Sequence, residues 1–158
     1  EAKDYQALKA CGEKMKEILN DLDKLNAFHP YCSLDKWMDD ARKMGDSPRL
    51  KDYYEKNARN LITTWGGSLN DYASRSWAGL ISDYYAKRWE VYINTFINAA
   101  EKGVEVDQQQ LEDELKEIEA GWVNATDRKN IRKDVHSTND GLLSFSTFLF
   151  SKYQRLVK

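Results

Sequence analysis

The sequence has 158 residues, of which 24 are basic and 26 acidic, giving a formal net charge of -2 with 41% hydrophobic residues. A chain of this size is expected to be one domain that buries roughly 70% of the surface its unfolded form exposes. The charges alternate in sign along the chain, and no apolar run reaches the roughly 18 to 20 residues of a membrane span. From this composition we expect neither a nucleic-acid partner nor a membrane-spanning segment.

The first half of the chain predicts three helices. Apolar residues spaced by three and four predict a long amphipathic helix that ends in the turn at 26–30: Tyr5, Leu8, Cys11, Met15, Ile18, Leu22 and Leu25. Ser33 is a candidate cap for a second, short helix that Gly45 closes. Ser47 followed by Pro48 is a strong start signal for a third helix, which we expect to stop at Gly66 and Gly67.

The second half predicts three more helical segments. The periodic pattern resumes at about Tyr72 and continues to Lys102, where Gly103 offers a stop. Asp107, with Gln110 three residues on, resembles a capping box that opens the next helix. A final helix is expected over 141–157. No five-residue stretch alternates as a strand would, so the sequence predicts an all-α domain, a bundle of five or six helices.

Cys11 and Cys32 stand alone, without CxxC spacing, and the sequence has two histidines. Metal-ligand spacing is absent, so neither a metal nor a cofactor is expected. A disulfide between the two cysteines is one alternative, and a pair of buried free thiols is favoured over it. The chain begins with Glu1 and shows helical periodicity from Tyr5, so we expect residues 1–158 to be one domain of a longer polypeptide.

The break in the helical pattern carries a family resemblance. Residues 57–66 read NARNLITTWG, and they are followed by DYA at 71–73, WAGL at 77–80, DYY at 83–85 and RW at 88–89. This series resembles the C-terminal region of the alpha-N-acetylglucosaminidases, glycoside hydrolase family 89. The resemblance extends upstream to Leu22-Asp23 and to WMDDAR at 37–42, and weakly downstream to Glu119 and Trp122.

The resemblance implies a three-part enzyme that removes terminal alpha-linked N-acetylglucosamine from glycans with retention of configuration. Its two catalytic carboxylates belong to a (β/α)8 barrel, and this chain would be the helical domain at the barrel mouth. The implied partners are that barrel in the same parent chain and the glycan, and family membership implies an exported enzyme. The sequence has no strand pattern for a barrel, so no catalytic residue and no turnover are expected from this chain alone.

The resemblance also implies that the break walls the sugar pocket, with Trp65, Leu69 and Tyr72 in contact with the substrate. An indole face can cover the C–H face of a sugar ring, and a tyrosine hydroxyl can take a polar contact. Each assignment has a structural alternative: Trp65 as a core residue, Tyr72 as a buried anchor, and Asp71 as a helix N-cap instead of a ligand for a sugar hydroxyl.

The aromatic residues after the break follow helical spacing, so Trp77, Tyr84, Tyr85 and Trp89 are expected to pack in the core or against the barrel. Arg88 within that face predicts a structural ion pair, with Asp83 or Glu55 as candidate partners, or a carbonyl contact. Two other functions stay open at this point. The chain could be a free-standing helical module that binds a protein, or a small carbohydrate-binding module without a barrel.

Overall fold

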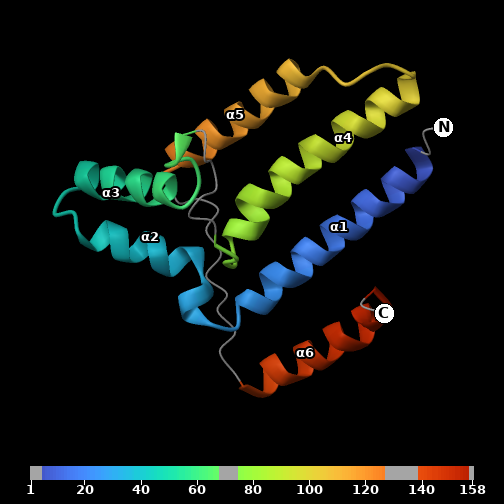
Figure 1. Ribbon diagram of the computed structural model, residues 1–158. Coiled ribbons are helices and arrows are strands. Elements are labelled where there is room, and N and C mark those ends of the chain that lie inside the picture. Colours follow the sequence, from blue (N-terminus) through green and yellow to red (C-terminus); the bar gives the residue numbers. More distant parts are fainter. Residues whose placement is uncertain (1–4, 68–74, 127–138, 157–158) are drawn as a thin grey trace.

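A computed structural model describes residues 5–67, 75–126 and 139–156 (Figure 1). These residues form six α-helices: α1 (Tyr5–Asn26), α2 (Leu34–Lys43), α3 (Pro48–Leu61), α4 (Ala86–Lys102), α5 (Gln108–Asn124) and α6 (Asn139–Tyr153). Three short helical turns accompany them: η1 (Pro30–Cys32), the π-helical turn η3 (Ile81–Tyr85) and η4 (Gln154–Leu156). No strand is found among the described residues, and the predicted all-α class is confirmed.

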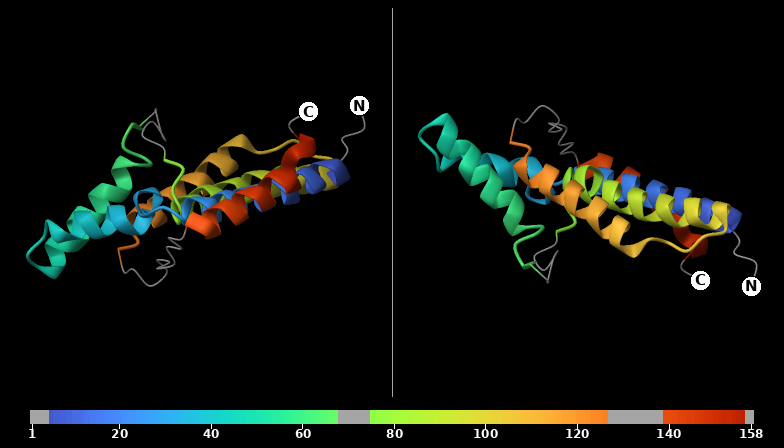
Figure 2. Two further views of the ribbon diagram at one scale, coloured as in Figure 1. Left: turned by 90° about the horizontal axis from the view of Figure 1, so that it is seen from below. Right: turned by 90° about the horizontal axis from the view of Figure 1, so that it is seen from above.

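Four helices lie side by side in the order α6, α1, α4, α5, and each runs antiparallel to its neighbour (Figures 1 and 2). Helices α2 and α3 form a hairpin that extends from one end of this layer, and α3 also contacts α5. The described residues between α3 and η3, 62–67 and 75–80, therefore lie where the hairpin meets the layer.

The core of the described residues sits at the same junction. Its buried members come from α2, α3 and the residue after it, η3 and the residue before it, and the end of α5: Leu34, Met38, Ala58, Ile62, Leu80, Tyr84, Trp122 and Val123. Trp77 and Tyr85 pack against this cluster from its edge. The aromatic face predicted after the break thus contributes to the core, although Trp89 of that face is largely exposed.

Local start and stop signals act as predicted at three helix ends. The Ser47 hydroxyl accepts a hydrogen bond from the Leu50 amide, with Pro48 at the first helical position of α3. Gly103 ends α4 with a left-handed φ of 65°. The Asp107 carboxylate accepts from the Gln110 amide at 3.0 Å and so caps α5.

Two capping predictions are wrong in detail. Ser33 precedes α2, but its side chain makes no capping hydrogen bond. The Gln110 side chain does not turn back to close a capping box, because its amide donates instead to Glu114 Oε1 at 2.8 Å. That contact joins residues four apart on one helix face, which is an ordinary side-chain pair within a helix.

The predicted helix from Tyr72 to Lys102 starts later than expected. Residues 75–79 are not helical, and the helix begins at Leu80. Backbone pairing to the chain before α2 holds this stretch extended: the Ala78 amide donates to Cys32 at 2.7 Å, and the Leu34 amide donates to Ala78 at 2.9 Å. These bonds use backbone groups that a continuous helix would have bonded internally.

The start of this helix is set by a residue on α1. Gly79 has φ of 85°, which a residue with a side chain rarely adopts. The Asp23 carboxylate, 2% exposed, accepts from the Gly79 amide at 2.8 Å and from the Ser82 amide at 3.1 Å. Asp23 therefore caps the helix from 56 residues away in sequence.

Both cysteines are free thiols. The prediction that both are buried is wrong for Cys11, which is exposed on α1, whereas Cys32 is half-buried. Helix α1 is covered by α4 on one side and α6 on another, and Cys11 lies on the part of its surface that neither helix covers.

Candidate functional site

Trp65 stands just beyond the C-terminal end of α3, where the family-like segment leaves the hairpin. Its backbone amide donates to the Asn60 carbonyl at 2.9 Å, which folds the chain back over the last helical turn. Thr63 and Thr64 tighten the same turn, because their hydroxyls donate to the Arg59 carbonyl and to the Asn60 side chain. The backbone that carries Trp65 is thus fixed by bonds to α3.

The Trp65 side chain is 57% exposed, in contrast to the 3% exposure of its neighbour Ile62. Trp65 is therefore not a member of the described core, and the core alternative does not fit this geometry. A half-exposed indole at the edge of a domain is the type of group that covers a ligand or a partner surface.

Leu69, Asp71 and Tyr72 lie outside the described residues. The structure therefore places Trp65 alone among the four predicted site residues, and the proposed contacts of the other three remain predictions.

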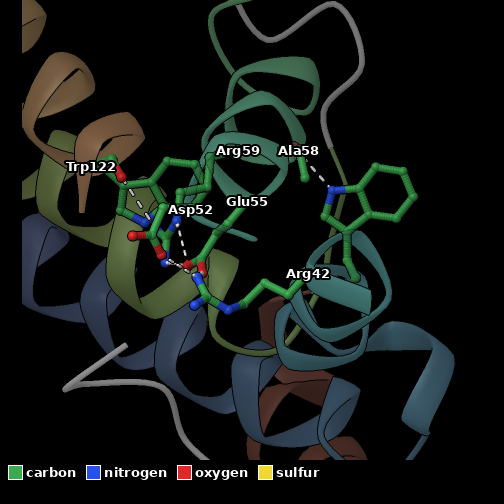
Figure 3. Close-up of polar contacts among 7 residues, drawn as sticks. Arg42, Asp52, Glu55, Ala58, Arg59 and Trp122 are labelled. Carbon is green, nitrogen blue, oxygen red and sulfur yellow. Dashed lines mark hydrogen bonds and ion pairs between the residues drawn. The ribbon is translucent and has the colours of Figure 1, made fainter. Parts of the chain in front are cut away.

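A buried cluster of charges holds α3 in place (Figure 3). Glu55 is 0% exposed and forms ion pairs with two arginines, Arg42 of α2 at 2.7 Å and Arg59 of α3 at 2.8 Å. Arg42 also reaches Asp52 at 2.8 Å. The Nη1 atom of Arg59 donates to the Trp122 carbonyl at 3.3 Å, so the cluster connects α2, α3 and α5.

The indole of Trp37 adds a further link between the two hairpin helices. Its N–H donates to the Ala58 carbonyl at 3.0 Å, and its ring packs against Trp77 at 5.7 Å between ring centroids. Trp37 thus connects α2, α3 and the extended chain after the break. Because the contacts come from both sides of the break, they fix where the intervening segment starts and ends.

A hollow of about 370 Å³ opens beside the break. Both sides of the break contribute to its wall, Leu61 and Ile62 before it and Arg75 and Trp77 after it. The remaining lining residues come from η1 and α2 and their junction: Tyr31, Ser33, Lys36, Trp37 and Asp40. Aromatic faces beside a few polar groups are typical of a small-ligand site.

The polar groups of this hollow are charged. Lys36 pairs with Asp40 at 2.5 Å, and its ammonium lies 4.9 Å from the centroid of the Tyr31 ring. Hydrogen bonds from Lys36 and then Lys43 lower the pKa of Asp40 to about 2, so this carboxylate stays ionised and accepts hydrogen bonds at neutral pH. Sequence reasoning missed Tyr31, Lys36 and Asp40, because their spacing on α2 and η1 is that of an ordinary solvated surface.

The buried carboxylates of the described residues all have structural partners. Glu55 accepts from two arginines, Glu119 pairs with Arg88 at 3.0 Å, Asp23 caps a helix, and Asp21 pairs with Lys152 at 2.6 Å. These four carboxylates thus serve in contacts between helices or at a helix end.

Arg88 makes a structural ion pair, as the sequence predicts, and one partner is an acid that the sequence did not indicate. It reaches Glu119 of α5 and lies 5.1 Å from the centroid of the Tyr84 ring. Glu55, one of the two predicted partners, pairs with Arg42 and Arg59 instead. Sequence alone could not distinguish these acids, because the packing of α4 on α5 decides which one lies within reach.

Among the described residues, no helix combines the length and the apolar character that crossing a bilayer requires.

Comparisons with known proteins agree on one family. The family model described as the C-terminal domain of alpha-N-acetylglucosaminidase matches residues 1–145. The chain is 31% identical over 123 residues to the human protein named alpha-N-acetylglucosaminidase, a match that covers 77% of this chain and 17% of that protein.

Solved structures from Clostridium perfringens share the fold. A family 89 glycoside hydrolase in complex with 2-acetamido-1,2-dideoxynojirmycin is 28% identical, with a TM-score of 0.76, over 94% of this chain and 18% of the other. A second structure, in complex with its substrate GlcNAc-alpha-1,4-galactose, is 30% identical, with a TM-score of 0.74, over 89% of this chain and 16% of the other. The chain thus spans less than a fifth of the length of these relatives.

Proposed function

The chain belongs to the family of alpha-N-acetylglucosaminidase C-terminal domains, and from this membership we propose that it is the helical accessory domain of an exported glycoside hydrolase. The substrate of that enzyme is a glycan that ends in alpha-linked N-acetylglucosamine. The catalytic carboxylates come from a barrel domain elsewhere in the same polypeptide, and the helical domain walls the mouth of the active site and braces the barrel.

The exposed indole of Trp65 is the observation that carries this proposal. Trp65 lies near the end of the family-like segment 57–66, its side chain stands outside the core, and its backbone amide donates a hydrogen bond to the Asn60 carbonyl. Rigid placement matters because a flat apolar ring contributes to binding only if its face stays parallel to the sugar ring it covers. Leu69 and Tyr72 would extend the same wall, and Asp71 would either bind a sugar hydroxyl or cap the chain.

The buried charge cluster supports the second part of the proposal, the bracing role. Glu55, Arg42 and Arg59 join three helices at the base of the break. The described residues on the two sides of the break are anchored, by this cluster before it and by the capped helix at Gly79 after it. In the enzyme, these anchored ends would brace the domain against the barrel.

The decisive experiment replaces Trp65 with alanine in the complete enzyme. Loss of a stacked indole should lower kcat/KM for an alpha-N-acetylglucosaminide by about tenfold to a hundredfold. The exposed position predicts a change in the free energy of unfolding within about 0.5 kcal/mol. Steady-state kinetics and thermal unfolding of the same sample measure the two quantities.

Tyr53→Ala is a matched control, because Tyr53 is an aromatic residue as exposed as Trp65 and lies in the first half of α3, well before the break. It should leave kcat/KM unchanged. The opposite pattern for Trp65→Ala, full activity with a loss of about 3 to 5 kcal/mol in stability, would show that the indole is a packing residue and would refute its place in the sugar pocket.

A further inference from the structure

The hollow beside the break is built from aromatic and charged side chains that no other part of the proposed mechanism uses. Tyr31 is 71% exposed, yet its ring is held by the Lys36 ammonium at 4.9 Å. Lys36 is in turn held by Asp40. The His29 ring lies 5.8 Å from the Tyr31 ring between centroids, and most of the tyrosine is still open to solvent. The ion pair beside it offers both a donor and an acceptor to a ligand.

The hollow also lies beside the residues that lead into Trp65. Leu61 and Ile62 line it immediately before Trp65, and the Trp65 amide is bonded to Asn60 at 2.9 Å. Arg75 and Trp77 line it on the other side of the break. A ligand covered by Trp65 and extending along the base of the break would reach this hollow next.

We propose that this hollow binds the second sugar of the glycan, the unit to which the terminal N-acetylglucosamine is attached. The inference rests on the proposed function, because a glycan cleaved at its terminal sugar must place the next unit beside the cleavage point. The apolar C–H face of that sugar stacks on Tyr31, and its hydroxyls bond to Lys36, Asp40 and Arg75. The domain thereby contributes to the choice of glycan as well as to the pocket for its terminal sugar.

The test compares two substrates of the complete enzyme. One is a disaccharide in which N-acetylglucosamine is alpha-linked to a second hexose. The other is N-acetylglucosaminyl alpha-fluoride, whose leaving group is a single atom and cannot contact the walls of the hollow. Tyr31→Ala should lower the ratio of kcat/KM for the disaccharide to kcat/KM for the fluoride by about threefold to tenfold. Tyr31→Phe keeps the ring and should restore the ratio, and the control Tyr53→Ala should not change it.

The outcomes separate this inference from the function on which it rests. Trp65→Ala should lower kcat/KM for both substrates alike. If it does and Tyr31→Ala leaves the ratio unchanged, the second sugar lies elsewhere and only the present inference is overturned. If Trp65→Ala changes neither substrate, the break is not at the active site and both proposals fall. Because Tyr31 is exposed, its removal should not alter thermal unfolding, so a changed ratio reports on binding.

Discussion

Glu55 has no contact with solvent, and its two carboxylate oxygens meet two different arginines. A buried carboxylate loses its hydration and is stable only if hydrogen bonds replace it. Arg59 adds a contact with the ring of Trp122, whose centroid lies 4.7 Å from the guanidinium carbon. Glu55 therefore links α2 to α3 directly, and it links both to α5 through Arg59.

Replacing Glu55 with alanine should destabilise the fold by about 3 to 5 kcal/mol, because the buried Arg59 guanidinium loses this counter-charge and Arg42 keeps only the half-exposed Asp52. Urea unfolding followed by circular dichroism measures this loss. Asp52→Ala is the matched control, since Asp52 contacts the same Arg42 but has a side chain that is 49% exposed. It should cost less than about 1 kcal/mol. Equal losses for both variants would contradict the central role of Glu55.

At the residue scale, the sequence predicts types of contact better than partners. The charge at Arg88 within an aromatic face correctly indicates a structural ion pair, and the packing of α4 on α5 makes Glu119 a partner that the sequence did not indicate. The same limit applies to the hollow: Tyr31, Lys36 and Trp77 are brought together by the pairing of Ala78 with the chain at Cys32 and Leu34. No periodicity in the sequence encodes that pairing.

At the element scale, α6 is held to α1 by a small set of contacts. Asp21 of α1 receives Lys152 at 2.6 Å and the Tyr153 hydroxyl at 2.7 Å, and Lys152 also reaches Glu17. Phe145 packs on Phe28 with 5.7 Å between ring centroids. No residue of α6 is fully buried, so these polar contacts contribute a large share of its attachment.

Asp21→Asn should therefore loosen α6 before it affects the rest of the fold. Loss of the charge should speed amide hydrogen exchange across α6 at least about tenfold, while exchange in α3 stays unchanged. Glu13→Gln is the control, because Glu13 is an exposed carboxylate of α1 that pairs with Lys16 and not with α6. Uniform acceleration in all helices would contradict a local attachment.

The same contact predicts how α6 responds to acid. Burial raises the pKa of Asp21, but the bonds from Lys152 and Tyr153 outweigh it and the pKa is lowered overall. A carboxylate with a lowered pKa stabilises the fold above its ordinary pKa near 4, and this contribution is lost as pH falls through the lowered value. Exchange in α6, corrected for its intrinsic pH dependence, should thus rise below about pH 4 in the unsubstituted chain. It should rise less in Asp21→Asn, where Glu17 still pairs with Lys152.

Helix boundaries illustrate which information is local. The start of α3 at Ser47-Pro48 and the end of α4 at Gly103 were predictable because adjacent residues determine them. The start of the helix at Leu80 was not, because its cap is Asp23 on α1 and its preceding residues pair with the chain before α2. Helical periodicity continues through residues 75–79 in the sequence, but tertiary hydrogen bonds override it.

At the scale of the whole molecule, the fold leaves an apolar surface on the outer helix of its layer. Leu143 and Phe150 of α6 are 70% and 71% exposed, and Phe148 on the same helix is half-exposed. Clustered apolar groups of this kind mark a contact with another surface. Since the chain spans less than a fifth of its relatives, the proposed function gives this surface a natural neighbour in the rest of the enzyme.

The 158-residue chain produced alone should therefore associate with itself through α6. Sedimentation velocity should show a concentration-dependent shift to larger species. The double variant Leu143→Ser, Phe150→Ser should remove most of this shift, because the apolar area that association would bury is lost. Met44→Ser is the control, since Met44 is equally exposed but lies at the turn between α2 and α3, away from α6 (Figure 1). If the unsubstituted 158-residue chain is monomeric, the prediction is wrong. If Met44→Ser abolishes association and the double variant does not, the contact surface lies elsewhere on the domain.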